Sequence, residues 1–125
     1  MNNCKINIWG RDFELPVSYD CYPGEDVLDT QEDALTKFLS ATEVIEASQT
    51  NIVEYVLSDD MAEIDGFAID NIFKYVMPKS IYIPRSKDKR VIAIMCNYKF
   101  DEEHGLAVTF INEVFSEIGA QDIVL

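Results

Sequence analysis

The chain has 125 residues, 48% of them hydrophobic, and a formal net charge of −13 at pH 7. This length suits one hydrophobic core of about 100–150 residues, so we expect a single domain over residues 1–125. The apolar content excludes a disordered chain, which needs low hydrophobicity. No apolar run approaches the roughly 20 residues of a membrane span, and residues 1–8 lack the features of a signal peptide. We therefore expect a cytoplasmic protein that does not bind membranes.

The first pattern along the chain is a β-hairpin. Polar and apolar residues alternate over 5–9 and again over 13–19, on either side of a turn at 10–12. Because Pro16 cannot donate a ladder hydrogen bond, we expect the second strand to lie at a sheet edge or to be bulged.

A helical segment follows a Pro-Gly turn. Thr30 is suited to be the N-cap of a first helix, and a second amphipathic helix is predicted from Thr42 to near Ser58. Residues 59–66 have the composition of an acidic loop. Apolar residues over 69–76 then predict a short third helix, which the next proline would end.

From residue 80 onward the hydrophobic period changes to two. Asn112-Glu113 occupies a tight turn where Asn-Gly would be easier, so we expect a bulge in the last hairpin. The predicted fold class is α+β, with an N-terminal β-hairpin, two to three central helices and a C-terminal four-stranded antiparallel meander. The four strands of this meander are predicted at 80–84, 91–98, 106–111 and 114–118.

Charge is distributed unevenly along the chain. Residues 12–70 hold sixteen Asp or Glu against one Lys, whereas residues 71–100 hold seven Lys or Arg against one Asp. A negative field disfavours binding to nucleic acid and to anionic membranes and attracts a basic protein. The basic loop at 85–90 has no interleaved aromatic residues, so we expect it to be solvated or to pair with the acidic helices. Solubility alone is the alternative explanation of the acidity.

Side chains for catalysis or metal binding are sparse. His104 is the only histidine, and Asp101, Glu103 and His104 could together form at most a weak metal site; a solvated turn is favoured. The acids that begin at Asp59 lack the spacing of a calcium loop. The three cysteines lack metal-ligand spacing, and no nucleophile or phosphate-binding motif is present. We therefore predict no enzyme activity, no cofactor and no metal.

Several segments together resemble a bacterial family of domains of unknown function, DUF6985, and the related DUF2004. The resemblance rests on residues 101–110 and 117–125, on the Trp9-Gly10 hairpin, and on residues 19–22 and 30–32. It implies a bacterial protein and a role as an immunity protein, which neutralises a toxin.

The leading hypothesis is a non-catalytic acidic module that binds a basic protein, such as a nuclease-like toxin. Opposite charges would speed the encounter, and apolar residues at the centre would hold the complex. The alternative is a self-associating structural domain that pairs through the strand around Pro16 or through the final hairpin. The sequence leaves open the oligomeric state and whether the acids share one surface. Six acidic residues without evident structural need are the candidates for partner binding: Glu43, Glu46, Glu54, Asp59, Asp60 and Glu63.

Overall fold

A six-stranded mixed sheet and two helices form the α+β fold of the computed structural model, which describes residues 3–62, 64 and 69–125. The strands stand in the sheet in the order of the sequence, β1 to β6. Their bounds are β1 Asn3–Ile8, β2 Arg11–Tyr19, β3 Val76–Ile83, β4 Val91–Tyr98, β5 Leu106–Ile111 and β6 Val114–Gly119. The helices are α1 Asp29–Ser40 and α2 Thr42–Ser58, and two short 3-10 helices are η1 Ile72–Lys74 and η2 Gln121–Ile123.

The N-terminal hairpin turns at Trp9-Gly10, one residue earlier than the sequence indicates. Both residues have positive φ, 53° and 86°, which is the geometry of a two-residue type I′ turn. Positive φ is unusual for tryptophan. Its indole is nevertheless buried, and Nε1 donates a hydrogen bond of 2.9 Å to Ser48 Oγ of α2. The turn therefore also connects the hairpin to the helices.

The hairpin joins the C-terminal strands through a parallel pair, β2 with β3, which the sequence does not reveal. β2 consequently lies between β1 and β3 and is not an edge strand as a whole, although at Pro16 itself only β1 pairs with it. Pro16 is tolerated because β2 pairs with β3 only over Val17–Tyr19, immediately after the proline.

Gln31 ties the start of α1 to the end of this parallel pair. It is 1% exposed; its Nε2 donates to the backbone oxygens of Asp20 and Ile83, at 2.9 and 3.1 Å, and its Oε1 accepts from the Leu28 N–H at 2.9 Å. The helix begins at Asp29, so Thr30 is not the N-cap. The Gln31 side chain thus accepts a hydrogen bond from a backbone N–H group at the N-terminus of α1 that has no partner within the helix.

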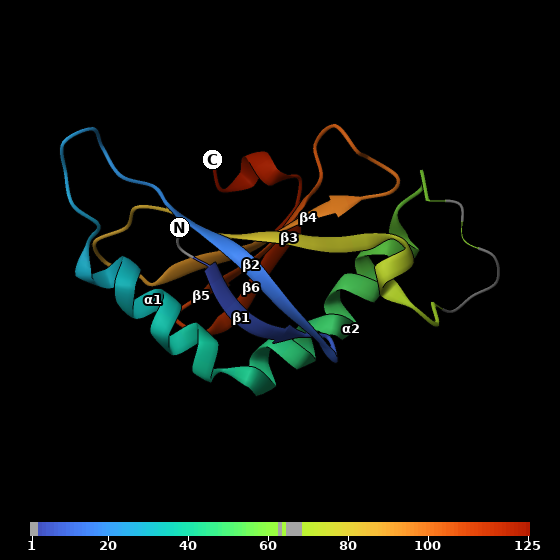
Figure 1. Cartoon of the computed structure of the whole chain (residues 1–125). Helices are drawn as coiled ribbons and strands as arrows, with labels where there is room; N and C mark the ends of the chain where they lie inside the picture. The colour runs from blue at the N-terminus through green and yellow to red at the C-terminus, as the bar shows by residue number, and fades with distance from the viewer. Residues whose placement is uncertain (1–2, 63, 65–68) are drawn as a thin grey trace.

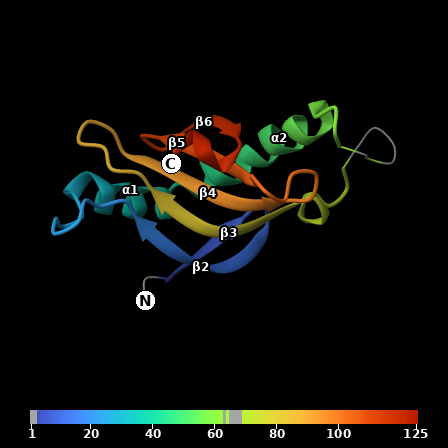
Figure 2. The same ribbon diagram turned by 90° about the horizontal axis from the view of Figure 1, so that it is seen from above.

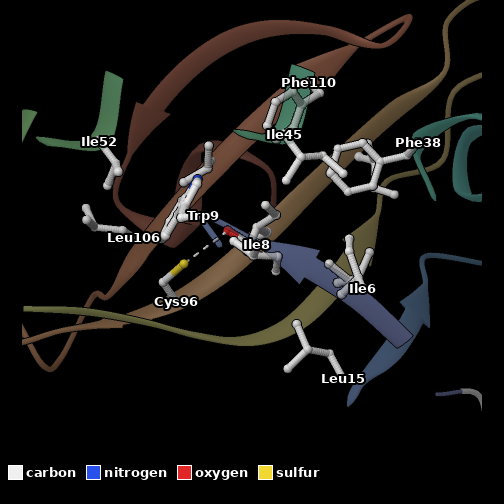
Figure 3. Packing of buried hydrophobic residues seen from close by; sticks show 14 of the residues in the cluster. Ile6, Ile8, Trp9, Leu15, Phe38, Ile45, Ile52, Cys96, Leu106 and Phe110 are labelled. Carbon is white, nitrogen blue, oxygen red and sulfur yellow. Dashed lines mark hydrogen bonds between the residues drawn. The ribbon is translucent and has the colours of Figure 1, made fainter. Parts of the chain in front are cut away.

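Both helices cover the same face of the sheet (Figures 1 and 2). α1 contacts β3 and β4, while α2 contacts both β1 and β6, the two edge strands, so the sheet curves over the helix layer. Figure 3 shows the core between the layers, where Ile45 and Phe38 from the helices meet Phe110 and Ile8 from the sheet. The Phe38 and Phe110 rings are 4.9 Å apart.

The predicted third helix is limited to the three residues of η1, and β3 begins at Val76, four residues before the predicted start. β3 includes Pro78, which pairs with Cys96, and the register shifts between Pro78 and Ser80. This bulge accommodates a proline inside a strand. The strands β3 to β6 do pair antiparallel in succession, but as part of the mixed sheet and not as a separate meander.

The last hairpin has the predicted tight turn and bulge. Asn112 and Glu113 have φ of 50° and 63°, and the register shifts between Thr109 and Phe110. Arg90 holds this turn: its guanidinium forms two hydrogen bonds with the Glu113 carboxylate, at 2.8 and 2.9 Å, and its backbone N–H donates to Asn112. The ion pair offsets part of the strain of a positive φ that glycine would adopt more easily.

The opposite face of the sheet carries a smaller apolar cluster. Ala93, Met95 and Ala107 are buried there, and Val124 and Tyr82 pack against them. The C-terminal segment that includes η2 thus lies on the face opposite the helices, as Figure 1 shows. In the described part of the chain, neither helix is long and apolar enough to span a membrane.

Candidate protein-binding site

Three of the candidate acids lie on one exposed face of α2. Glu43, Glu46 and Glu54 recur at helical spacing and are exposed, whereas the opposite face of the helix packs on the core through Ile45 and Ile52. Glu46 and Glu54 line the same shallow hollow. We call Glu43, Glu46 and Glu54 the α2 stripe.

The charge of the α2 stripe is not balanced locally. α2 contains no Lys or Arg, and among the residues that the structure describes no ion pair involves the three glutamates. Like charges on one helix face are slightly destabilising, by about 0.2–0.5 kcal/mol per close pair. Glu43 is in the first turn of α2, where the helix dipole favours a negative charge, whereas Glu46 and Glu54 have no such compensation among the described contacts.

Asp59 and Asp60 lie elsewhere, in a second hollow beyond the C-terminal end of α2. This hollow, of about 640 Å³, lies between the end of α2 and the segment that joins β4 to β5. We call it the Tyr98 hollow. Its lining includes Tyr55, Asp59, Asp60, Tyr98, Phe100 and Asp101.

Asp59 has a structural function, contrary to the expectation that none of the candidates does. The hydroxyl group of Tyr98, a residue 2% exposed, donates a hydrogen bond of 2.6 Å to Asp59 Oδ2, and the Met61 N–H donates to Oδ1 at 3.0 Å. Burial, together with the hydrogen bond to Asp59, raises the pKa of Tyr98. Asp60 is exposed, so of the two it is the acid that remains available to a ligand.

Aromatic rings form part of the walls of the Tyr98 hollow. The Tyr55 and Tyr98 rings meet edge to face at 6.3 Å, and the Phe100 ring lies 5.6 Å from that of Tyr98. The pKa of Tyr55 is raised by burial and then by the negative charges of Asp59 and Asp101. The hollow thus combines half-buried aromatic rings with a negative potential.

The single histidine is part of an exposed turn. His104 Nδ1 lies 2.9 Å from Asp101 Oδ1, and the His104 backbone N–H donates to the same oxygen. The hydrogen bond with Asp101 raises the pKa of His104 and lowers that of Asp101. Glu103 acts on His104 only through its charge. Within the described ranges, no three His, Cys, Asp or Glu side chains form a group that could hold a metal ion.

The arginines of the basic loop are engaged within the chain. Arg85 forms an ion pair of 2.6 Å with Glu25 and lies over the Tyr22 ring, and Arg90 pairs with Glu113. The two arginines therefore pair with acids of the same chain that lie outside the helices, whereas Lys87 and Lys89 are exposed, in line with the expected solvation of this loop. Nothing in the local sequence identifies these partners.

The structure accordingly divides the six candidates. It brings Glu43, Glu46 and Glu54 to one face and places Asp59 and Asp60 in a separate hollow, and Glu63 lies outside the described residues. The helical spacing of the glutamates could have revealed the first group. Sequence reasoning missed Tyr55, Tyr98 and Phe100 because they join the site only through the fold.

Comparison with curated proteins and with solved structures finds no match to this chain. A family model matches residues 1–125 of the chain. The match therefore includes the sheet, both helices and the residues that line both hollows. The chain belongs to the family described as a domain of unknown function, DUF6985.

Proposed function

We propose that this domain is a non-catalytic module that binds a basic protein in the cytoplasm through its acidic surface. The observation that supports the proposal best is the α2 stripe, because its three exposed carboxylates have no ion-pair partner among the described residues. A row of unneutralised charge steers an oppositely charged partner and speeds its association.

In the more specific form of the proposal, the domain is an immunity protein and the partner a nuclease-like toxin. An enzyme that handles phosphate presents a basic active site, and an acidic helix face matches it in sign. The overall charge is −13, and Arg85 and Arg90 pair with acids of the same chain. Both observations support a complex between a negative domain and a positive partner.

The test is capture of partners from the native source by the immobilised domain at low salt, followed by affinity measurements with the purified partner. We expect a partner of net positive charge, with an affinity that falls as salt rises. Glu43→Gln, Glu46→Gln and Glu54→Gln together should weaken binding more than tenfold, mainly through the association rate.

A matched control removes the same number of charges from other surfaces. Glu14, Glu102 and Glu117 are exposed and lie outside α2, so their triple change to Gln alters the net charge equally. If both triple variants bind alike, or if no basic protein is captured, the proposal is wrong. For the toxin form, the captured protein must also degrade nucleic acid and lose that activity when the domain is bound.

Self-association is the second candidate, and the position of β6 favours it. β6 is an edge strand, and Val114 at its start is 64% exposed, so two copies could pair through the final hairpin. The other predicted route, through the strand around Pro16, is restricted, because β1 pairs with one side of β2 and β3 pairs with Val17–Tyr19 on the other. Sedimentation at several concentrations tests this alternative, and a monomer throughout would contradict it.

A further inference from the structure

The Tyr98 hollow combines two features that favour an organic cation. Three carboxylates, Asp59, Asp60 and Asp101, belong to its lining, and none of the described lining residues is Lys or Arg. Tyr55 and Phe100 add half-buried aromatic rings to the same walls. Phe100 already stacks on Tyr75 and has Lys99 Nζ 5.8 Å from its ring centroid, so Tyr55 is the ring better placed to receive a further cation. Aromatic faces attract cations through the ring quadrupole, and carboxylates attract them by charge.

The existing hydrogen bonds argue against a metal ion as the occupant. Both oxygens of Asp59 already accept hydrogen bonds, from Tyr98 and Met61, and both oxygens of Asp101 face the His104 ring. A hard cation such as Ca²⁺ needs six to eight oxygen ligands. A guanidinium group suits these walls better, because it is flat, stacks on rings and binds carboxylates through several N–H donors.

The surroundings of the hollow point to a protein as the source of that group. Met61 lines the hollow and is 76% exposed, and methionine is favoured at binding surfaces because its side chain adapts to different partners. The same helix whose end forms one wall carries the α2 stripe. A basic protein that covers the stripe would thus reach the hollow with neighbouring side chains.

We infer that the Tyr98 hollow receives an arginine side chain of the basic partner, with the guanidinium group beside Tyr55 and its N–H groups directed to Asp60. The inference rests on the proposed function and gives it a specific contact. Arginine is among the residues that contribute most to binding at the centre of interfaces, and it does so in pockets that exclude water.

The probe for the experiment is N-acetyl-arginine methylamide, titrated into the ¹⁵N-labelled domain and followed by two-dimensional NMR. We expect millimolar binding with shifts centred on residues 55–61 and 98–105. The citrulline analogue, which has nearly the same shape and no charge, should cause no comparable shifts. Equal shifts with citrulline, or shifts at these residues with CaCl₂ and none with the arginine probe, would overturn the inference.

Two variants test the walls separately. Asp60→Asn should weaken binding of the probe about three- to fivefold, as expected for a partly exposed charge pair. Tyr55→Leu should weaken it about two- to fivefold through loss of the cation–π contact, whereas Tyr55→Phe should retain it. Asp26→Asn is the matched control, since Asp26 is exposed and lies outside the hollow; an equal loss in this variant would contradict the site.

The two proposals fail in different ways. If the arginine probe binds in the hollow but no basic protein is captured, the hollow stands and the proposed function does not. If a captured partner depends on the α2 stripe but binds Asp60→Asn and Tyr55→Leu as tightly as the unmodified domain, the proposed function stands and the arginine contact is wrong.

Discussion

The hydrogen bond between Tyr98 and Asp59 should make a large and measurable contribution to stability. It joins β4 to the residue that follows α2, and the two residues are 39 positions apart in the sequence. Its acceptor is a carboxylate and its length is 2.6 Å, so it belongs to the strong, charge-assisted class worth about 1.5–3 kcal/mol. We expect Tyr98→Phe to lower the free energy of unfolding by about 1.5 kcal/mol, because the half-buried carboxylate can regain water.

Asp59→Ala should cost more, about 2–3 kcal/mol, because it leaves the buried hydroxyl of Tyr98 without its acceptor and removes the bond to Met61. In a double-mutant cycle the two changes should therefore couple by about 1–2 kcal/mol. Tyr55→Phe is the matched control, since the Tyr55 hydroxyl group makes no hydrogen bond within the part of the chain that the structure describes, and it should cost less than about 0.5 kcal/mol.

Urea unfolding measures these differences, with the fluorescence of the single, buried Trp9 as the signal. Equal slopes of the unfolding curves would show that the variants share one folded state. A coupling energy near zero, so that Tyr98→Phe costs as much without Asp59 as with it, would refute the assignment of this bond.

Three further predictions concern other parts of the fold. Gln31→Glu places a carboxyl group against two backbone carbonyl oxygens, so the folded-state pKa of this carboxyl group should rise above the usual value near 4.3. The variant should therefore lose least stability, relative to the unmodified domain, below about pH 4.3. At pH 7 the loss should reach about 3 kcal/mol, measured by urea unfolding. Glu113→Gly relieves a positive φ but loses the ion pair with Arg90, so at low salt the variant should be about as stable as the unmodified domain. In 1 M NaCl, where the ion pair is screened, the variant should be about 1 kcal/mol more stable. Lower stability at both salt concentrations would contradict this prediction. His104 should titrate above its ordinary pKa of 6.5 in NMR, and Asp101→Asn should lower this pKa toward the ordinary value, although the charges of Glu103 and Asp122 would still raise it. Because the pKa is raised, the pair stabilises the fold below pH 6.5, and this contribution disappears as pH rises through the folded-state pKa. A titration unchanged by Asp101→Asn would assign the shift to another group.

The sequence predicts the individual elements of this fold better than their connections. Alternation over 13–19 and helical spacing over 42–58 arise from local burial, and the structure confirms strand and helix there. The parallel contact between β2 and β3 brings together segments far apart in the sequence, and Gln31 bridges carbonyl groups at their ends; no local pattern encodes such a tie.

Pro78 shows how tertiary structure overrides a local rule. A proline normally ends a helix, and the apolar residues before it fit a helical period, so a third helix was a reasonable prediction. The chain instead places Pro78 in β3 opposite Cys96, with a bulge beside it. Pairing with β4 in the core outweighs the weak preference of a short segment.

The candidate site was predictable to a similar extent. Three glutamates at helical spacing indicate one exposed stripe without any structure. The Tyr98 hollow was not predictable, because Tyr55 and Tyr98 are 43 positions apart and meet only when α2 packs against the end of the sheet. The structural function of Asp59 was missed for the same reason.

The proposed function depends on binding of a basic protein by the α2 stripe. The most direct measurement is the association rate of a captured partner with the unmodified domain and with the Glu43→Gln, Glu46→Gln, Glu54→Gln variant, over a range of salt concentrations. We predict a fast rate for the unmodified domain that falls steeply with salt, and a slower rate for the variant that changes little. Equal rates and equal salt dependence for the two proteins would contradict the claim.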